Sequence, residues 1–301
     1  MKTLLKTLAI GAVGGMLSVA AQAGPVTYTA NPANGGAAGA AFQADKITGP
    51  YSAEIDQDNA GNFTESGLIQ FGNFSLGGTN LGGGTSGLGT SYNLYGLFTA
   101  AGTATATPLG GGLATVVVKF TSFLAEIWTD PNRDSTFSFN AANANDQDGF
   151  TGQNAGSQFA DAGGSAAHSL TNTAEDQLVL QITGGLSFPR VATLLVNTSN
   201  GGVLSGGFNV KSKFNTDFGA PGEADDFFQF FPFNFLNLNL LASGQTGQTT
   251  GNFFNPGGFT DNTFQNASVD VTFIPEPTTV GLFGLGLLGL GAMARRRRRK
   301  V

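Results

Sequence analysis

Three polar residues at alternate positions are the clearest candidates for metal-ion chemistry in this sequence. Asp130, Asn132 and Asp134 are spaced like the first three oxygen ligands of a calcium-binding loop. The remainder of such a loop is missing, because Ser135 replaces the turn glycine and Ala141 stands where a bidentate glutamate is needed. Asp and Asn are also the residues that turns ordinarily use. The sequence therefore leaves open a Ca²⁺ site at these three residues or a set of solvated turn residues, and it indicates no other cofactor.

Candidate catalytic groups are scarce. The chain has no cysteine and one histidine, His168, which lies among Gly, Ala and Ser residues and is expected to be an exposed polar residue. Two G-x-G-x-x-G matches, starting at Gly82 and Gly284, do not join a strand to a soluble helix and so do not indicate a nucleotide site. Asp146 and Asp148 could serve a polysaccharide hydrolase or lyase, but neighbours in one turn suit poorly the ~5–9.5 Å separation of glycosidase carboxylates. We predict no enzymatic activity.

The aromatic residues are mostly phenylalanine, with 27 Phe against one Trp and four Tyr. Phenylalanine has no polar group that needs a partner when buried, so this bias indicates a core more than a wet binding surface. A sugar-binding platform ordinarily uses Trp or Tyr, and only Trp128, Tyr92 and Tyr95 are well placed for that role. A lectin-like polysaccharide-binding module that acts through Trp128 or Tyr95 is therefore the alternative function.

Short apolar runs, several of them alternating, are expected to build the body that carries these residues. Glycine-containing dipeptides between the runs supply turns with positive φ, and no stretch from 24 to 274 shows a sustained helical period. The sequence predicts a mainly β protein, with an antiparallel β-sandwich-like domain over residues 24–274 and glycine-rich loops. The clearest predicted strands cover residues 116–128, 178–182, 191–196, 208–214 and 269–273.

Residues 1–23 have the three parts of a secretory signal peptide. A positively charged start is followed by an apolar stretch over residues 8–20 and by a small-x-small cleavage site formed by Ala21 and Ala23. The mature chain is therefore expected to begin near Gly24, on the outer side of the inner membrane.

The C-terminal end also has three parts. The tripeptide Pro275, Glu276 and Pro277 precedes an apolar run over residues 278–294. Seventeen residues in a helix span about 25 Å, which is at the short limit for crossing a bilayer. We therefore expect one C-terminal transmembrane helix, whose cytoplasmic end is fixed by a block of positive charge. That block consists of Arg295, Arg296, Arg297, Arg298, Arg299 and Lys300.

This ending resembles the PEP-CTERM sorting signal of Gram-negative bacteria. The resemblance covers residues 275–301 and rests on the Pro-Glu-Pro tripeptide, the Gly- and Leu-rich run over 281–291, and the arginine block. It implies recognition by an exosortase, a membrane protease that cuts near the tripeptide. The Asn- and Phe-rich body, with its segment 92–99, more loosely resembles flocculation-associated PEP-CTERM proteins. That second resemblance implies a role in cell aggregation within exopolysaccharide.

The distribution of charge separates the body from its ends. Residues 24–277 contain six basic and all 20 acidic residues, a balance of −14. Such a body repels phosphate, which argues against nucleic acid as a partner. The sequence as a whole predicts an exported, exosortase-processed protein of the cell surface or extracellular matrix. Its expected partners are the exosortase, exopolysaccharide and, before processing, the inner membrane.

Overall fold

A computed structural model describes most of the body of this protein. Several predicted features lie outside the described residues: the signal peptide, Glu276 and Pro277, the helix over 278–294, the basic block, and the pair Asp146 and Asp148. Within the part of the chain that is described, no helix is long and apolar enough to cross a membrane. The described residues are 24–58, 60–139, 150–153, 157–159, 168–182, 187–198, 202–216, 226–230, 238–250, 254–255, 258–259 and 263–275.

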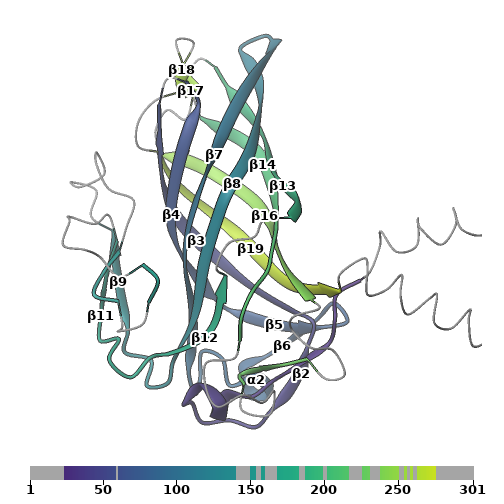
Figure 1. Ribbon diagram of the computed structural model, residues 1–301, viewed down its shortest axis with the longest axis vertical. Coiled ribbons are helices and arrows are strands. Elements are labelled where there is room, and N and C mark those ends of the chain that lie inside the picture. The colour runs from purple at the N-terminus through teal and green to yellow at the C-terminus, as the bar shows by residue number, and fades with distance from the viewer. Residues whose placement is uncertain are drawn as a thin grey trace, which may run out of the picture.

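Eight long strands form one antiparallel sheet that closes on itself, called the closed sheet below (Figure 1). The ring is completed by the pairing of the last of these strands in the chain with the first, over the register from Thr263–Ile55 to Thr272–Lys46. The order around the ring is β3 (Lys46–Gln57), β4 (Asn62–Phe71), β7 (Asn93–Gly110), β8 (Leu113–Asp130), β13 (Ser187–Asn197), β14 (Val203–Ser212), β16 (Leu238–Thr250) and β19 (Thr263–Pro275).

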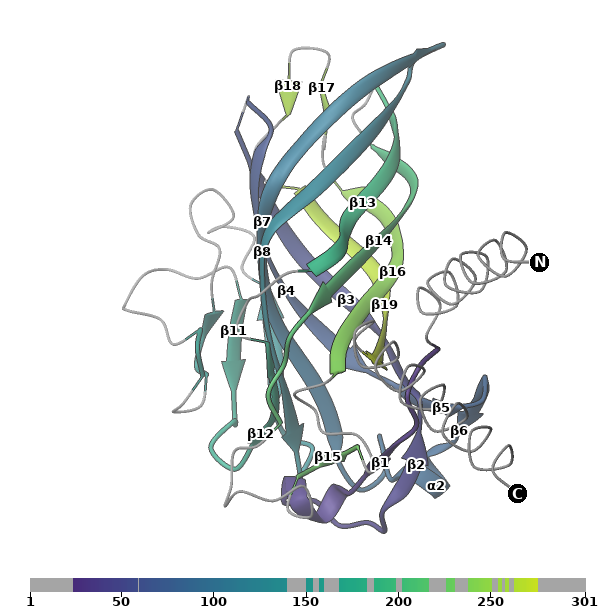
Figure 2. The same cartoon turned by 45° about the vertical axis from the view of Figure 1, so that its right-hand side comes forward.

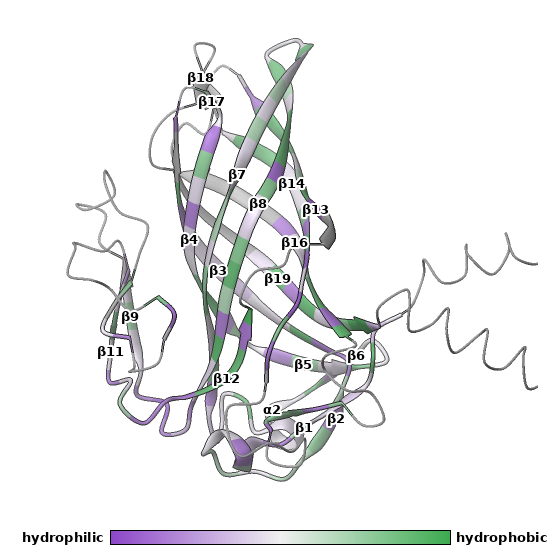
Figure 3. Ribbon diagram, viewed as in Figure 1, coloured by the Kyte–Doolittle hydropathy of each residue, from purple (hydrophilic) through white to green (hydrophobic). Residues whose placement is uncertain are grey.

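The prediction of a mainly β, antiparallel domain is confirmed, but the sandwich arrangement is wrong. The main strands form one closed sheet and not two stacked sheets. Alternation of apolar and polar residues is the same in both architectures, since one face of each strand meets the core in either case. What separates them is the pairing of β3 with β19, two strands more than 200 residues apart in the chain. Bands of contrasting hydropathy follow one another along β4 and β8 (Figure 3).

Short elements gather at one end of the closed sheet (Figure 2). An aromatic cluster lies at this end, where Tyr28 packs edge-to-face on Phe273 at 5.1 Å and Phe230 lies 4.7 Å from the same ring. Phe228 and Phe214 complete the cluster, at 5.6 and 4.9 Å from Phe273. The elements at this end are β1 (Tyr28–Ala30), η1 (Pro32–Gly35), β2 (Phe42–Ala44), β5 (Asn73–Leu76), β6 (Thr79–Leu81), α2 (Gly83–Ser86) and β15 (Phe228–Gln229).

A second group of strands covers part of the outer face of the closed sheet and is called the outer layer below. It buries a separate apolar cluster against β7 and β8, which contains Tyr95, Leu97, Trp128, Phe150 and Leu170. The outer layer is a small three-stranded sheet beside β3 and β4, and it comprises β9 (Thr136–Phe139), β10 (Phe150–Thr151) and β11 (His168–Thr171). β12 (Gln177–Ile182) belongs instead to the same sheet as the closed strands, where it pairs edge to edge with the C-terminal part of β8. A short hairpin, β17 (Phe254–Asn255) and β18 (Gly258–Phe259), lies at the other end of the molecule (Figure 1).

Phenylalanine and glycine occupy paired positions inside the closed sheet. Phe98 is the direct register partner of Gly67, and a Cβ atom added at Gly67 would overlap its ring. The same cross-strand pairing joins Phe63 to Gly102 and Phe208 to Gly244, where an added Cβ would lie 2.8 and 2.7 Å from the ring. Each ring therefore lies over the backbone of the neighbouring strand, which explains how a glycine-rich sequence forms a stable sheet.

Candidate functional site

The predicted calcium-loop residues lie in the turn between β8 and β9. The Asp130 carboxylate accepts backbone N–H groups of Asp134 at 3.2 Å and Ser135 at 3.3 Å. The Asn132 amide donates to the Glu175 carboxylate. Asp130 therefore satisfies the backbone of the turn, as Asp commonly does at such positions.

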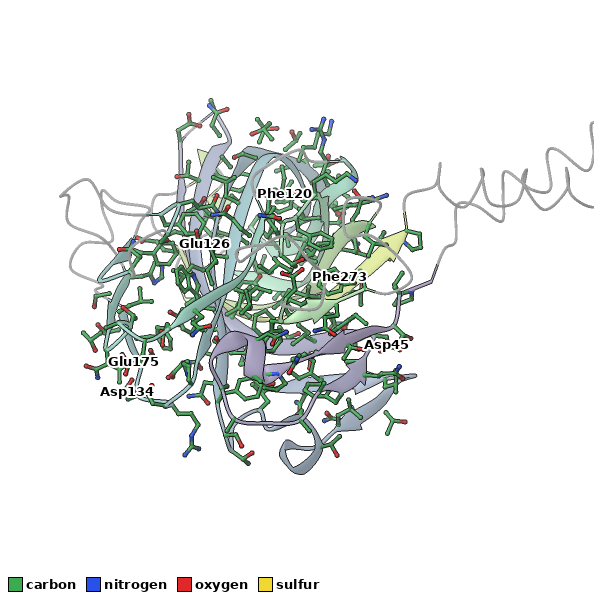
Figure 4. All side chains as sticks on the ribbon, turned by 60° about the horizontal axis from the view of Figure 1, so that its bottom comes forward. Asp45, Phe120, Glu126, Asp134, Glu175 and Phe273 are labelled. Carbon is green, nitrogen blue, oxygen red and sulfur yellow. The ribbon has the colours of Figure 1, made fainter. Side chains whose placement is uncertain are left out.

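The structure does bring further carboxylates to this turn. Asp134 and Glu175 lie near each other at the periphery of the molecule (Figure 4). Partial loss of hydration, then Glu175 and Asp130, raise the pKa of the Asp134 carboxyl above its usual value. Among the described residues, no group of three or more acidic or histidine side chains is arranged to hold a metal ion. The Ca²⁺ site at Asp130, Asn132 and Asp134 stays a prediction.

Asp176 links this turn to the apolar cluster of the outer layer. Its Oδ2 atom accepts the Ser135 hydroxyl and the Tyr95 hydroxyl, each at 2.7 Å. Burial raises the pKa of Asp176 to about 6, against the opposing effect of these two hydrogen bonds, while the Asp130 and Glu175 charges add to the rise. Burial also raises the pKa of the Tyr95 hydroxyl, and the bond to Asp176 adds to this shift.

Glu126 is the most completely enclosed carboxylate among the described residues, with a relative exposure of 0%. Two donors meet its Oε2 atom, the Trp128 indole N–H at 3.1 Å and the Ser157 hydroxyl at 2.7 Å. Two more meet Oε1, the backbone N–H of Gln158 at 2.6 Å and the Gln181 amide at 3.1 Å. Sequence reasoning did not single out Glu126, although a carboxylate within the apolar run 123–128 was a signal that could have found it.

His168 is buried, so the expectation of an exposed residue is wrong. Its ring stacks on Phe150 with centroids 5.2 Å apart, and its Nε2–H donates to the Ser66 carbonyl oxygen at 3.1 Å. Burial lowers the pKa of His168 to about 4, and the bond to Ser66 opposes part of that shift. The residue begins β11 and packs over β4, a long-range contact that the surrounding Gly, Ala and Ser residues do not indicate.

The aromatic residues proposed for a sugar platform are all enclosed. Trp128 and Tyr95 are each 3% exposed, and Tyr92 is 0% exposed. Trp128 and Tyr95 pack beneath the outer layer, and Tyr92 contacts Phe227 at 6.1 Å. None of the three offers a ring face to solvent, so recognition of a polysaccharide through Trp128 or Tyr95 is wrong.

A different surface feature has the composition of a polar binding site. A pocket of about 200 Å³, called the outer groove below, lies between the outer face of β3 and β4 and the strands β9 to β11. Its polar side chains include Ser52 and Gln70 from the closed sheet. Ser138 and Ser169 also line it, but their hydroxyls are hydrogen-bonded to each other on the exposed side of the outer layer. Phe137 adds an aromatic wall. His168 also lines the outer groove and, because burial lowers its pKa to about 4, is uncharged at neutral pH.

The two ends of the described body lie together. The backbone N–H of Val26 donates to the Phe273 carbonyl oxygen at 2.7 Å. Pro275 is the last residue of β19 and is the register partner of Leu238 in β16. The sorting tripeptide therefore starts at the point where the closed sheet ends, at the same end as residue 24.

Comparison with known proteins identifies this C-terminal region. Residues 273–299 match the family model of the PEP-CTERM protein-sorting motif. No curated protein matches the chain. Among solved structures, Ail, the attachment invasion locus protein of Yersinia pestis, is 6% identical, with 76% of this chain and 96% of that chain covered and a TM-score of 0.16. The matched motif implies export, a surface-directed sorting signal and processing by an exosortase, and the chain therefore carries a PEP-CTERM protein-sorting motif at its C-terminal end.

Proposed function

We propose that this protein is a non-enzymatic component of the cell surface or extracellular matrix that acts in exopolysaccharide-associated cell aggregation, in flocs or biofilm. The observation that carries the proposal is the sorting motif at residues 273–299. The acidic body, with its balance of −14, suits a soluble surface or matrix component.

The position of the two ends supports processing without damage to the body. Because Val26 is hydrogen-bonded to Phe273, the segments before and after the body both leave from one end. Cleavage near Pro275–Pro277 would remove the chain beyond β19 and leave all eight strands of the closed sheet paired.

Mass spectrometry of the extracellular protein tests the processing step. We expect mature molecules that lack residues 1–23 and everything after roughly residue 277. Replacement of Glu276 by Ala should leave the unprocessed C-terminus in the inner membrane. Mature extracellular molecules that retain Arg295–Lys300 would contradict processing by an exosortase.

Deletion of the gene tests the role in aggregation. We expect planktonic growth with normal polysaccharide secretion, observed by microscopy of flocs or biofilm and by assay of the secreted polymer. Restoration by the wild-type gene is the control. Loss of polysaccharide synthesis itself would contradict a role confined to adhesion.

We further propose that the outer groove is the surface that contacts polysaccharide. The Ser52 hydroxyl and the Gln70 amide, on the outer face of the closed sheet, suit the hydroxyls of a neutral sugar, and Phe137 provides an apolar wall. Titration of the processed protein with purified exopolysaccharide should show a loss of affinity of about tenfold for Gln70→Ala, by the cost of one hydrogen bond. Thr105→Ala, an exposed change on β7, is the matched control. Equal affinity of the Gln70→Ala variant and the wild type would contradict this assignment.

A further inference from the structure

The interior of the closed sheet is not completely filled. A cavity of about 80 Å³ lies among its inward-facing side chains. Four of the lining positions carry only a methyl group, Ala100 on β7, Ala125 on β8, Ala192 on β13 and Ala242 on β16. A closed sheet of eight strands has an interior that side chains can just fill, or that can hold one small ligand. Small residues on four strands favour the second arrangement.

The large residues of the interior leave the space open. Phe63, Phe98 and Phe208 all line the cavity, and each lies over a glycine of the adjacent strand. A ring in that position covers the wall of the sheet and does not project to the centre. Tyr51 holds two of these rings by edge-to-face contacts, with Phe98 at 5.7 Å and with Phe208 at 5.8 Å. The aromatic wall is therefore braced by neighbouring rings.

One carboxylate lies among these apolar groups. Glu65 lines the cavity, on the same face of β4 as Phe63 and Ile69, and is 8% exposed. Tyr51 lines the same cavity. Burial raises the pKa of the Tyr51 hydroxyl, and the negative charge of Glu65 adds to this rise. Burial of a carboxylate in an apolar interior is costly, so its presence calls for a reason. A carboxylate has about four lone-pair sites and can accept a ligand donor in addition to protein donors.

We infer that the interior of the closed sheet binds a short aliphatic amine, with the alkyl chain in the apolar cavity and the ammonium group at Glu65. The apolar lining selects the alkyl part, and the carboxylate selects a cationic donor over an alcohol or an acid. The volume limits the chain, since a dry cavity of about 150 Å³ holds one benzene molecule and the present one is smaller. The inference is independent of the outer groove and of aggregation.

The test uses the processed, secreted protein and a series of primary amines from propylamine to octylamine, with the matching alcohols and carboxylates. Calorimetric titration should show affinity that rises about fourfold per methylene and then stops at the length that fills the cavity. Amines should bind more tightly than alcohols of equal length, and carboxylates should not bind. Absence of binding across the whole series, or carboxylates that bind as well as amines, would overturn the inference.

Two substitutions separate the cavity from nonspecific association. Ala192→Leu fills the space and should abolish binding, whereas Thr193→Leu, exposed on the same strand, should leave the affinity unchanged. Should Ala192→Leu not fold, Ala100→Val fills the cavity from β7. Glu65→Gln should remove the preference for amines while alcohols still bind, and the exposed change Glu175→Gln should not. Unaltered binding in both filled variants would place the amine elsewhere and refute the assignment.

Discussion

The two faces of strand β8 bury their side chains by different means. Phe123, Ala125 and Ile127 line the interior of the closed sheet, where the contacts are apolar. Glu126 and Trp128, which alternate with them, face the outer layer and form hydrogen bonds. Apolar contacts tolerate small shifts, whereas a buried carboxylate is stable only while each of its donors stays in place. The interior therefore confers stability on the closed sheet, and the polar network fixes where the outer layer lies on it.

Removal of an interior ring should have the largest effect on stability. Phe98→Ala deletes a side chain that is 5% exposed, and we expect the free energy of unfolding to fall by about 3–5 kcal/mol. Denaturant unfolding of the processed protein measures it. In the Phe98→Ala background, Gly67→Ala should be less damaging than alone, since its methyl group no longer meets the ring. Equal costs of Gly67→Ala in both backgrounds would contradict the paired packing of these residues.

Acid should destabilise the outer layer through His168. Its folded pKa of about 4 lies below the ordinary value of 6.5, so between these two pH values the unfolded chain binds a proton that the folded protein does not. Stability should fall as the pH drops through this window, by about 3 kcal/mol at most for this residue. The pH dependence of chemical unfolding measures the effect, and His168→Gln should flatten it. An equally steep profile in that variant would show that other groups cause the acid sensitivity.

Asp176 should have the opposite effect on the pH dependence of stability, over nearly the same pH range as His168. Its folded pKa of about 6 lies above the ordinary 3.8, so the folded protein binds the extra proton and gains stability as the pH falls through this range. Asp176→Asn should therefore make the loss of stability in acid steeper, where His168→Gln makes it shallower. A shallower profile for Asp176→Asn would contradict the raised pKa.

The Glu126 network should be sensitive to a change of one atom. Glu126→Gln keeps the shape of the side chain but replaces one carboxylate oxygen by an amide N–H₂ group. That group, itself a donor, then faces a donor such as the Ser157 hydroxyl or the Gln158 backbone N–H, which has lost its acceptor. We expect a loss of about 2 kcal/mol, with the outer layer released before the closed sheet unfolds. Hydrogen exchange should show faster exchange in β9 and β11 and unchanged protection in β13 and β14. Uniform loss of protection would contradict a separate role for the outer layer.

The smallest expected effect is that of calcium at Asp130, Asn132 and Asp134. Millimolar Ca²⁺ should raise the Tm of the processed protein, with a stabilisation below about 1 kcal/mol for a weak site. If these three residues bind the ion, their replacement by Ala abolishes the increment, although the variant itself is less stable because Asp130 accepts two backbone N–H groups. An equal increment in the variant would show only screening of the acidic body, and this is the outcome we expect.

Local sequence patterns predict the strands well but not their partners. The runs at 116–128, 178–182 and 191–196 fall within β8, β12 and β13, because alternation reflects burial on one face of each strand. The excess of phenylalanine correctly indicates a core. The closing contact of β3 with β19 depends on register between distant segments, which alternation does not encode.

The site residues were harder to predict for a related reason. Trp128 and Tyr95 stayed candidates for the alternative sugar-binding function because the strands that cover them come later in the chain, after residue 135. His168 lies in a segment with the composition of a loop, and only its contacts with Phe150 and Ser66 show that it is buried. The sorting tripeptide, by contrast, is recognisable from residue type and position alone, since a linear signal needs no partner strand.

The double-sided pairing of β19 has a mechanical consequence. The strand is hydrogen-bonded along its length to β16 on one side and to β3 on the other, and it ends at Pro275. A pull applied at this end, along the strand, loads both ladders in shear, because antiparallel hydrogen bonds lie perpendicular to the strand axis. Many bonds must then yield together, whereas a peeling force breaks them one at a time. A body attached to a surface or polymer through the cut end at Pro275 would therefore hold its load through a strand that is paired on both sides.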